Sequence, residues 1–166
     1  MRTMADLALR LLGIGGAAAL VACSPAAEVG EATNTISVYQ HPVSGLEVVP
    51  VTVTTDSASH VFKAEVARTP QQQSRGLMGR EELGRDEAMI FPYNPPKIAS
   101  FWMKDTPRSL DIIFVGPDGR IINIGERTEP FSTESVMSDE PASLILEING
   151  GLSRELGIGP GDLVEW

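Results

Sequence analysis

Cysteine is nearly absent from this chain: Cys23 is the only one in 166 residues. A single cysteine cannot form a disulfide within the chain or a sulfur-rich metal site, so the domain must be stable through packing alone. Long apolar runs are also missing. The apolar stretch near the start, residues 11–22, is too short to cross a bilayer as a stable helix.

Basic residues are scarce as well, with 13 Lys and Arg against 22 Asp and Glu and a net charge of −9. An acidic chain repels nucleic acid and anionic lipid, so we expect neither as a partner. The basic residues are unevenly placed. Residues 63–108 hold eight basic and six acidic side chains, whereas residues 109–166 hold three and eleven. The first of these segments is therefore where a cationic site is expected.

What is present around Cys23 is the pattern of a bacterial lipoprotein signal. A weakly positive start is followed by the apolar residues 11–22, and the tetrapeptide Leu-Val-Ala-Cys ends at Cys23. In such a signal the thiol takes up a diacylglyceryl group before cleavage. We therefore expect a signal peptide at residues 1–22 and a membrane anchor on Cys23. An ordinary secretory signal with a chance cysteine is the alternative.

Cleavage would leave residues 23–166, with 11 basic and 21 acidic side chains and a net charge of −10. An acylated Cys23 would leave no thiol for a nucleophile or a metal ligand. Ser24, not an acidic residue, follows the cysteine. By the sorting rule of Gram-negative cells this favours the periplasmic side of the outer membrane.

The rest of the chain predicts a flexible tether, residues 23–45, and one β-rich domain, residues 46–166. The fold class is mostly β: a single antiparallel sandwich or barrel-like, jelly-roll-like domain with one or two short helices. The predicted strands share short β-branched or apolar runs between turn residues. They are residues 49–55, 61–67, 88–91, 98–104, 110–115, 120–125, 143–148 and 163–166.

Other segments have turn or helix chemistry. Thr69 followed by Pro70 predicts a helix N-cap and a first helical residue, with the helix ending around Gly76 to Gly79. Three prolines in residues 92–96 predict a loop, and the polar residues 128–142 predict another.

Two predicted strands carry a carboxylate among apolar neighbours. In residues 110–115, Asp111 shares a face with Ile113 and Val115, and in residues 143–149, Glu147 shares one with Ile145. A carboxylate in such a position is either paired or costly. Arg75 and Lys104, from the basic segment, are the candidate partners.

These residues define a candidate site: Arg75, Lys104, Asp111 and Glu147 as a polar cluster, with Trp102 as a flat wall. The alternative is a buried ion-pair network that only fixes strand register. Metal binding through His41 and His60 is not expected, because neither has a second ligand at the right spacing. No Ser-His pair or phosphate loop is present, so neither a catalytic residue nor a cofactor is assigned.

Three motifs in the same order resemble the family called domain of unknown function 192. They are residues 75–80 (Arg-Gly-Leu-Met-Gly-Arg), 101–106 (Phe-Trp-Met-Lys-Asp-Thr) and 110–114 (Leu-Asp-Ile-Ile-Phe). The resemblance continues to residues 159–162 and covers about residues 49–166. It implies a mostly β, sandwich or jelly-roll-like fold in a bacterial and archaeal family that is often exported and has no established activity. Many members carry two cysteines in the loop matching residues 130–135, which has none here, so no disulfide or thiol chemistry carries over.

Three functions remain open. The first is a lipid-anchored binding or accessory module of the cell envelope, with Arg75 and Lys104 holding a small polar or anionic ligand. The second is a hydrolytic enzyme with Asp111 or Glu147 as general acid/base, which requires both carboxylates in one cleft. The third is a module that docks an envelope protein and has no small-molecule site, which requires the charged cluster to be satisfied and closed.

Overall fold

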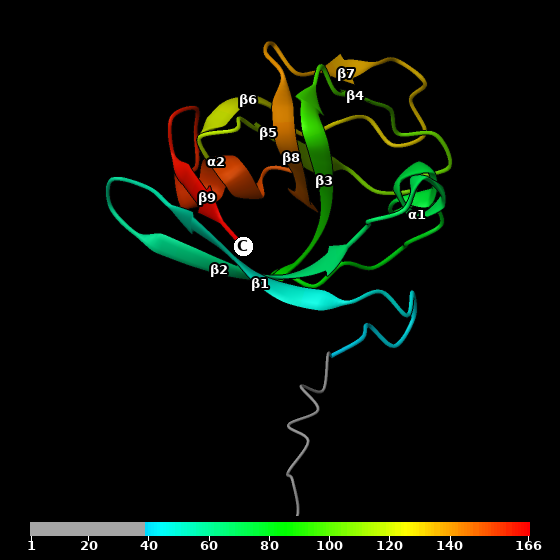
Figure 1. Cartoon of the computed structure of the whole chain (residues 1–166). Helices are drawn as coiled ribbons and strands as arrows, with labels where there is room; N and C mark the ends of the chain where they lie inside the picture. The colour runs from blue at the N-terminus through cyan, green and yellow to red at the C-terminus, as the bar shows by residue number, and fades with distance from the viewer. Residues whose placement is uncertain (1–38) are drawn as a thin grey trace, which may run out of the picture. The chain divides into compact units, whose positions relative to one another are not determined.

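The computed structural model describes residues 39–166 (Figure 1). The predicted signal peptide, Cys23 and most of the tether lie outside the described residues. The described part has nine strands and two short helices. In chain order they are β1 (Val48–Thr54), β2 (Ser59–Val66), α1 (Pro70–Arg75), β3 (Glu87–Lys97), β4 (Ser100–Phe101), β5 (Leu110–Val115), β6 (Ile121–Gly125), β7 (Val136–Met137), β8 (Ala142–Asn149), α2 (Leu152–Leu156) and β9 (Leu163–Glu165).

Seven strands form one curled sheet in the order β6-β5-β8-β3-β2-β1-β9, and β4 and β7 form a small second sheet. Neighbours in the large sheet are antiparallel, except that β2 and β3 run parallel. Parallel neighbours need a crossover, and the segment containing α1 supplies it. A bridge between Arg120 and Leu163 brings the two ends of the sheet together. The predicted mostly β, barrel-like or sandwich-like domain with two short helices is confirmed.

The central strands are buried on both faces, which explains why their sequences are apolar without a break. All six residues of β5 are buried. One face of β5 and β8 carries Ile113 and Leu146 into a core inside the curl, closed by α2 and β9. The other face carries Ile112 and Ile145 into a second core beneath the small sheet. The alternation predicted for these two strands is confirmed.

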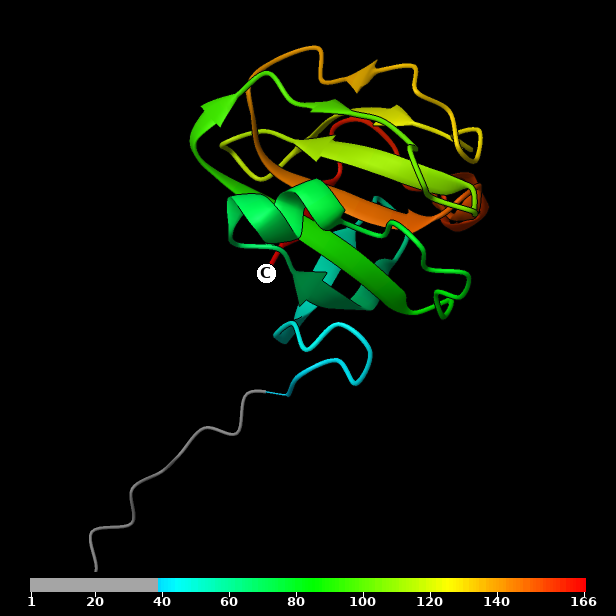
Figure 2. The same cartoon turned by 90° about the vertical axis from the view of Figure 1, so that its right-hand side faces the viewer.

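Helix α1 begins and ends where the sequence predicts. Thr69 is the N-cap, and its side chain accepts a hydrogen bond from the backbone N–H of Gln72 while the Gln72 side chain accepts one from Thr69. Gly76 ends the helix with a φ of 46°. In Figure 2 α1 lies in front of β3, and a Cβ on Gly76 would lie 3.4 Å from the Phe91 ring, so the end of this helix is close to β3.

Three local predictions are wrong. The proline-rich residues 92–96 belong to β3, because its pairing with β8 shifts register between Pro92 and Lys97 and leaves room for residues without a backbone N–H. The strand predicted at residues 98–104 is only Ser100–Phe101. The chain turns after it, with Thr106 N–H bonded to the Met103 carbonyl and Asp105 at a φ of 54°. The loop predicted at residues 128–142 contains β7.

Residues before β1 also belong to the folded part. Gln40 pairs with Glu47, and the N–H of His41 donates to the carbonyl of Leu46. Both hydrophobic cores lie within residues 46–166. Neither α1 nor α2 is long and apolar enough to cross a membrane, and the described residues contain no other helix.

Candidate functional site

A cavity of about 360 Å³ opens between the end of α1, the outer half of β3 and the β4 region. Its lining combines charged, polar and aromatic groups on the face of the sheet that carries the second core. These groups include Arg75, Phe91, Tyr93, Lys97, Phe101, Trp102 and Glu147. The structure thus brings together three of the five predicted site residues, namely Arg75, Trp102 and Glu147.

Glu147 lies deepest among the charged groups of the cavity, with 4% of its surface exposed. Strand β8 places it between Met89 of β3 and Ile112 of β5, and both neighbours are apolar. Burial raises the pKa of its carboxyl group to about 8, and no hydrogen bond or ion pair to another described residue offsets this. At neutral pH the group therefore mostly keeps its proton and can donate or accept a hydrogen bond.

Arg75 is the last residue of α1 and is exposed at the mouth of the cavity. The capping box fixes where the helix starts, and Gly76 fixes where it ends. The two caps therefore fix the backbone of Arg75 beside the mouth of the cavity, where its guanidinium group adds a positive charge.

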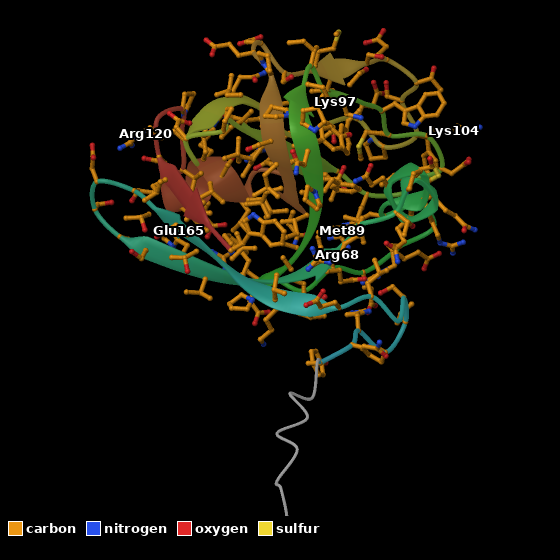
Figure 3. All side chains as sticks on the ribbon, viewed as in Figure 1. Arg68, Met89, Lys97, Lys104, Arg120 and Glu165 are labelled. Carbon is orange, nitrogen blue, oxygen red and sulfur yellow. The ribbon has the colours of Figure 1, made fainter. Side chains whose placement is uncertain are left out.

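A second cation, Lys97, lies at the far end of β3 and also lines the cavity (Figure 3). Its ammonium group is 3.9 Å from the centre of the Tyr93 ring, a cation–π contact. Burial, and then the charge of Glu147, raise the pKa of the Tyr93 phenol. The sequence does not point to Tyr93 or Lys97, because the surrounding prolines predict a loop and hide the continuation of the strand.

Aromatic rings form the apolar wall. Phe91 and Phe101 pack edge to face with ring centres 5.0 Å apart, and Phe101 contacts Phe114 of the second core in the same way. Trp102 is 49% exposed at the rim. Lys104 lies over the Trp102 ring at 5.5 Å but does not line the cavity. In Figure 3 it lies out toward solvent, on the α1 side of the molecule.

Asp111 does not join the cavity. Its side chain is fully buried and accepts four hydrogen bonds at 2.6–2.9 Å, from the backbone N–H groups of Arg127, Gly151 and Ser153 and from the Ser153 hydroxyl. The carboxylate thus anchors the loop after β6 and the start of α2 onto β5. It contacts neither Arg75 nor Lys104, the cations expected to pair with it.

A buried ion pair that the sequence analysis did not identify lies beside β2. Glu65 is 2% exposed; its carboxylate is 2.9 Å from Arg80 and accepts a hydrogen bond from Ser44. His41 lies 3.6 Å from the same carboxylate. The sequence signal for Glu65 is weaker than that for Asp111 or Glu147, because Lys63 lies two residues before it on the same face of β2. This cluster holds residues 41–44 against the domain.

Two further features bear on function. Within residues 39–166, no group of three His, Cys, Asp or Glu side chains lies close enough together to hold a metal ion. Large apolar side chains are exposed in or beside the small sheet, and one of them, Trp102, lines the cavity. They are Ile98, Trp102, Phe131 and Met137.

The curled sheet and this cavity define a small, mostly β domain with a mixed polar and aromatic pocket. The family model of DUF192, described as uncharacterised, matches residues 51–166. The chain therefore belongs to the DUF192 family, as its motifs indicate. No curated protein matches the chain.

Two solved structures are similar over most of their length. A Novosphingobium aromaticivorans protein of unknown function is 54% identical, with a TM-score of 0.76, over 77% of this chain and 91% of that one. A Sinorhizobium meliloti protein, provisionally described as a transcription regulator, is 35% identical, with a TM-score of 0.70, over 72% of this chain and 94% of that one. These similarities support the fold and the family; the biochemical function of the family is unknown.

Proposed function

We propose that this protein is an exported, lipid-anchored module of the cell envelope that binds a small polar or anionic ligand in the cavity beside α1. The observation that carries the proposal is a cavity with Arg75 and Lys97 at its mouth, aromatic walls, and a buried carboxyl group that has no partner among residues 39–166. A buried polar group without a hydrogen-bond partner lowers the stability of the fold, so such a group in a pocket is expected to contact a ligand.

Each residue has a role in this proposal. Arg75 and Lys97 attract and hold the anionic part of the ligand, and Lys97 takes the place that the sequence suggests for Lys104. Trp102 covers one side of the ligand and excludes water. Glu147 makes the deepest polar contact, whereas Asp111 supports the fold and does not touch the ligand.

The hydrolytic alternative loses its main support, because Glu147 is the only carboxylate among the residues that line this cavity. A hydrolase with two carboxylates needs both in one cleft. The protein-docking alternative requires a closed, satisfied charged cluster. Arg75 and Glu147 instead line the cavity. The apolar side chains exposed in or beside the small sheet keep protein docking as an outcome of the ligand screen.

The export and anchoring part of the proposal is supported by the pattern that ends at Cys23. Metabolic labelling of the producing bacterium with a radioactive fatty acid tests it directly. The chain should carry the label and lose it when Cys23 is replaced by Ser. A chain that is released into the medium or stays unlabelled would contradict the anchor.

The ligand-binding part is tested by a thermal-shift screen of the full chain, kept in solution with detergent. The panel holds envelope sugars, peptidoglycan fragments, organic acids, phosphates and divalent metals. A ligand at 100 times its dissociation constant stabilises the folded state by about 2.7 kcal/mol, which is a shift of several degrees. The shift should shrink in Arg75→Met and Lys97→Met.

Lys104→Met is the matched control, because it removes a lysine that is beside an aromatic ring but outside the cavity lining. The shift should survive this change. A shift that disappears in Lys104→Met and survives in Lys97→Met would place the ligand elsewhere. Silence across the panel would contradict the cavity as a ligand site and favour the protein-docking alternative.

A further inference from the structure

The charges of the cavity are ordered by depth. Its basic groups, Arg75 and Lys97, are exposed at the mouth, and its acidic group, Glu147, is 4% exposed. A ligand with only negative groups would use the mouth, and it could bind the deep carboxyl group only while that group keeps its proton. The deep end of the cavity therefore favours a ligand group that is not negatively charged.

Aromatic side chains line this cavity together with Glu147: Phe91, Tyr93, Phe101 and Trp102. The faces of aromatic rings attract cations, and Tyr93 already takes the Lys97 ammonium on its face at 3.9 Å. The buried carboxyl group and the aromatic rings beside it each favour the binding of an organic ammonium ion.

The protein itself does not supply that cation. Across the sheet, Glu147 faces Met89 and Ile112, and no ion pair joins it to Arg75, Lys97 or any other described residue. Tyr93, from β3, is the titratable group near it. A buried carboxyl group needs either a proton or a positive partner, so a ligand cation can replace the proton.

We propose that the ligand of this cavity is a small zwitterion whose ammonium group contacts Glu147 between the aromatic rings and whose acidic group contacts Arg75. Amino acids and the free ends of short peptides have this chemistry. This inference rests on the proposed ligand-binding function and names its ligand class. Binding releases the proton of Glu147 to solvent, and the ammonium–carboxylate pair takes its place.

Methylammonium is the test probe, because it is small enough for any geometry of the deep end and carries only the positive group. The measurement is the apparent pKa of Glu147 in the full chain, from NMR of ¹³C-labelled carboxyl groups, assigned with Glu147→Gln. With methylammonium chloride at about 0.3 M, the pKa should fall by about half a pH unit relative to sodium chloride, which corresponds to a dissociation constant on the order of 0.1 M. The Asp111 signal, outside the cavity, should not move.

A second measurement does not depend on resolving that titration. At pH 8, methylammonium should raise the melting temperature of the wild type above its value in sodium chloride, and should fail to do so in Glu147→Gln. Arg75→Met should keep the response to methylammonium but weaken the response to glycine, which has both groups.

Each other outcome overturns the inference in a distinct way. If methylammonium acts no differently from sodium, the deep end does not take an ammonium group. If acetate raises the pKa of Glu147 while methylammonium does nothing, the cavity binds an anion through the protonated acid, and the proposed function stands while the zwitterion does not. If no probe acts and the ligand screen is silent, both fail.

Discussion

Asp111 and Glu147 are acidic residues on the neighbouring strands β5 and β8, and they differ in their hydrogen-bond partners. Asp111 receives four hydrogen bonds, three of them from backbone N–H groups. Glu147 has apolar neighbours and a cavity in front of it. Both follow the same sequence pattern, so only the partners separate a structural carboxylate from a candidate site.

Replacement of Asp111 by Asn should lower the free energy of unfolding by about 3–5 kcal/mol, because the amide NH₂ would face buried N–H donors that then lack an acceptor. Urea unfolding followed by circular dichroism measures this. Asp118→Asn, on an exposed turn, should stay within about 0.5 kcal/mol of the wild type. A change near zero at Asp111 would show that its hydrogen bonds do not stabilise the fold.

Glu147 should make stability depend on pH. Its pKa is about 8 in the folded protein against an ordinary 4.5, so the folded state binds the proton more tightly than the unfolded state. The stabilisation is complete below pH 4.5 and is lost as pH rises to about 8, at about 1.4 kcal/mol per pH unit and on the order of 5 kcal/mol in total.

Glu147→Gln cannot ionise, so its stability relative to the wild type should rise steadily across this pH range. Urea unfolding at a series of pH values gives the two curves. Glu82→Gln, an exposed site, should follow the wild-type curve. Parallel curves for Glu147→Gln and the wild type would mean that the carboxyl group has a partner or solvent access in solution.

Helix α1 is the element that positions the mouth of the cavity, and its six residues contain no buried one. Its stability therefore depends on its caps and on the Gln73 side chain, which donates hydrogen bonds to the carbonyls of Ala67 and Pro92. Thr69→Ala removes the N-cap and should cost about 1 kcal/mol of stability. It should also weaken any ligand that contacts Arg75, because the last turn of the helix would be less well fixed.

Equilibrium unfolding and the thermal shift with ligand measure the two effects of Thr69→Ala separately. Gln71→Ala is the control within the same helix, since Gln71 is exposed and makes no side-chain hydrogen bond to another described residue. It should leave both quantities unchanged. Equal effects of the two substitutions would mean that the cap does not fix the helix.

Local chemistry made α1 and the alternation of β5 and β8 predictable, because caps and two-residue periodicity act over a few neighbours. The continuation of β3 through Pro95 and Pro96 was not predictable in this way. It depends on a register shift against β8, more than forty residues further along the chain. The site follows the same division. Arg75 and Trp102 lie in the matched motifs and Glu147 lies in an alternating strand, whereas Lys97 and Tyr93 reach the cavity only through the continuation of β3.

At the scale of the whole molecule, β9 closes the sheet. It pairs with β1, and Leu163 at its start bridges to Arg120. Val164 is 4% exposed and points into the inner core. Truncation of this side chain in Val164→Ala should cost about 2 kcal/mol through lost apolar burial and the cavity left behind.

The neighbouring Glu165 points to solvent, so Glu165→Ala should change stability by less than about 0.5 kcal/mol. Chemical unfolding followed by circular dichroism gives both values. A similar small loss for both substitutions would show that β9 is not needed to close the inner core.

The pairing of β1 with β9 also bears on how the molecule folds. Thr52 pairs with Glu165, so closure of the sheet joins segments that lie far apart along the chain. Contacts of such long range are slow to form, and domains dominated by them fold in milliseconds to seconds. Until β9 arrives, the outer edge of β1 carries free backbone donors and acceptors that can pair with another chain. Aggregation therefore competes with folding until the three residues of β9 pair with Thr52, Val53 and Thr54.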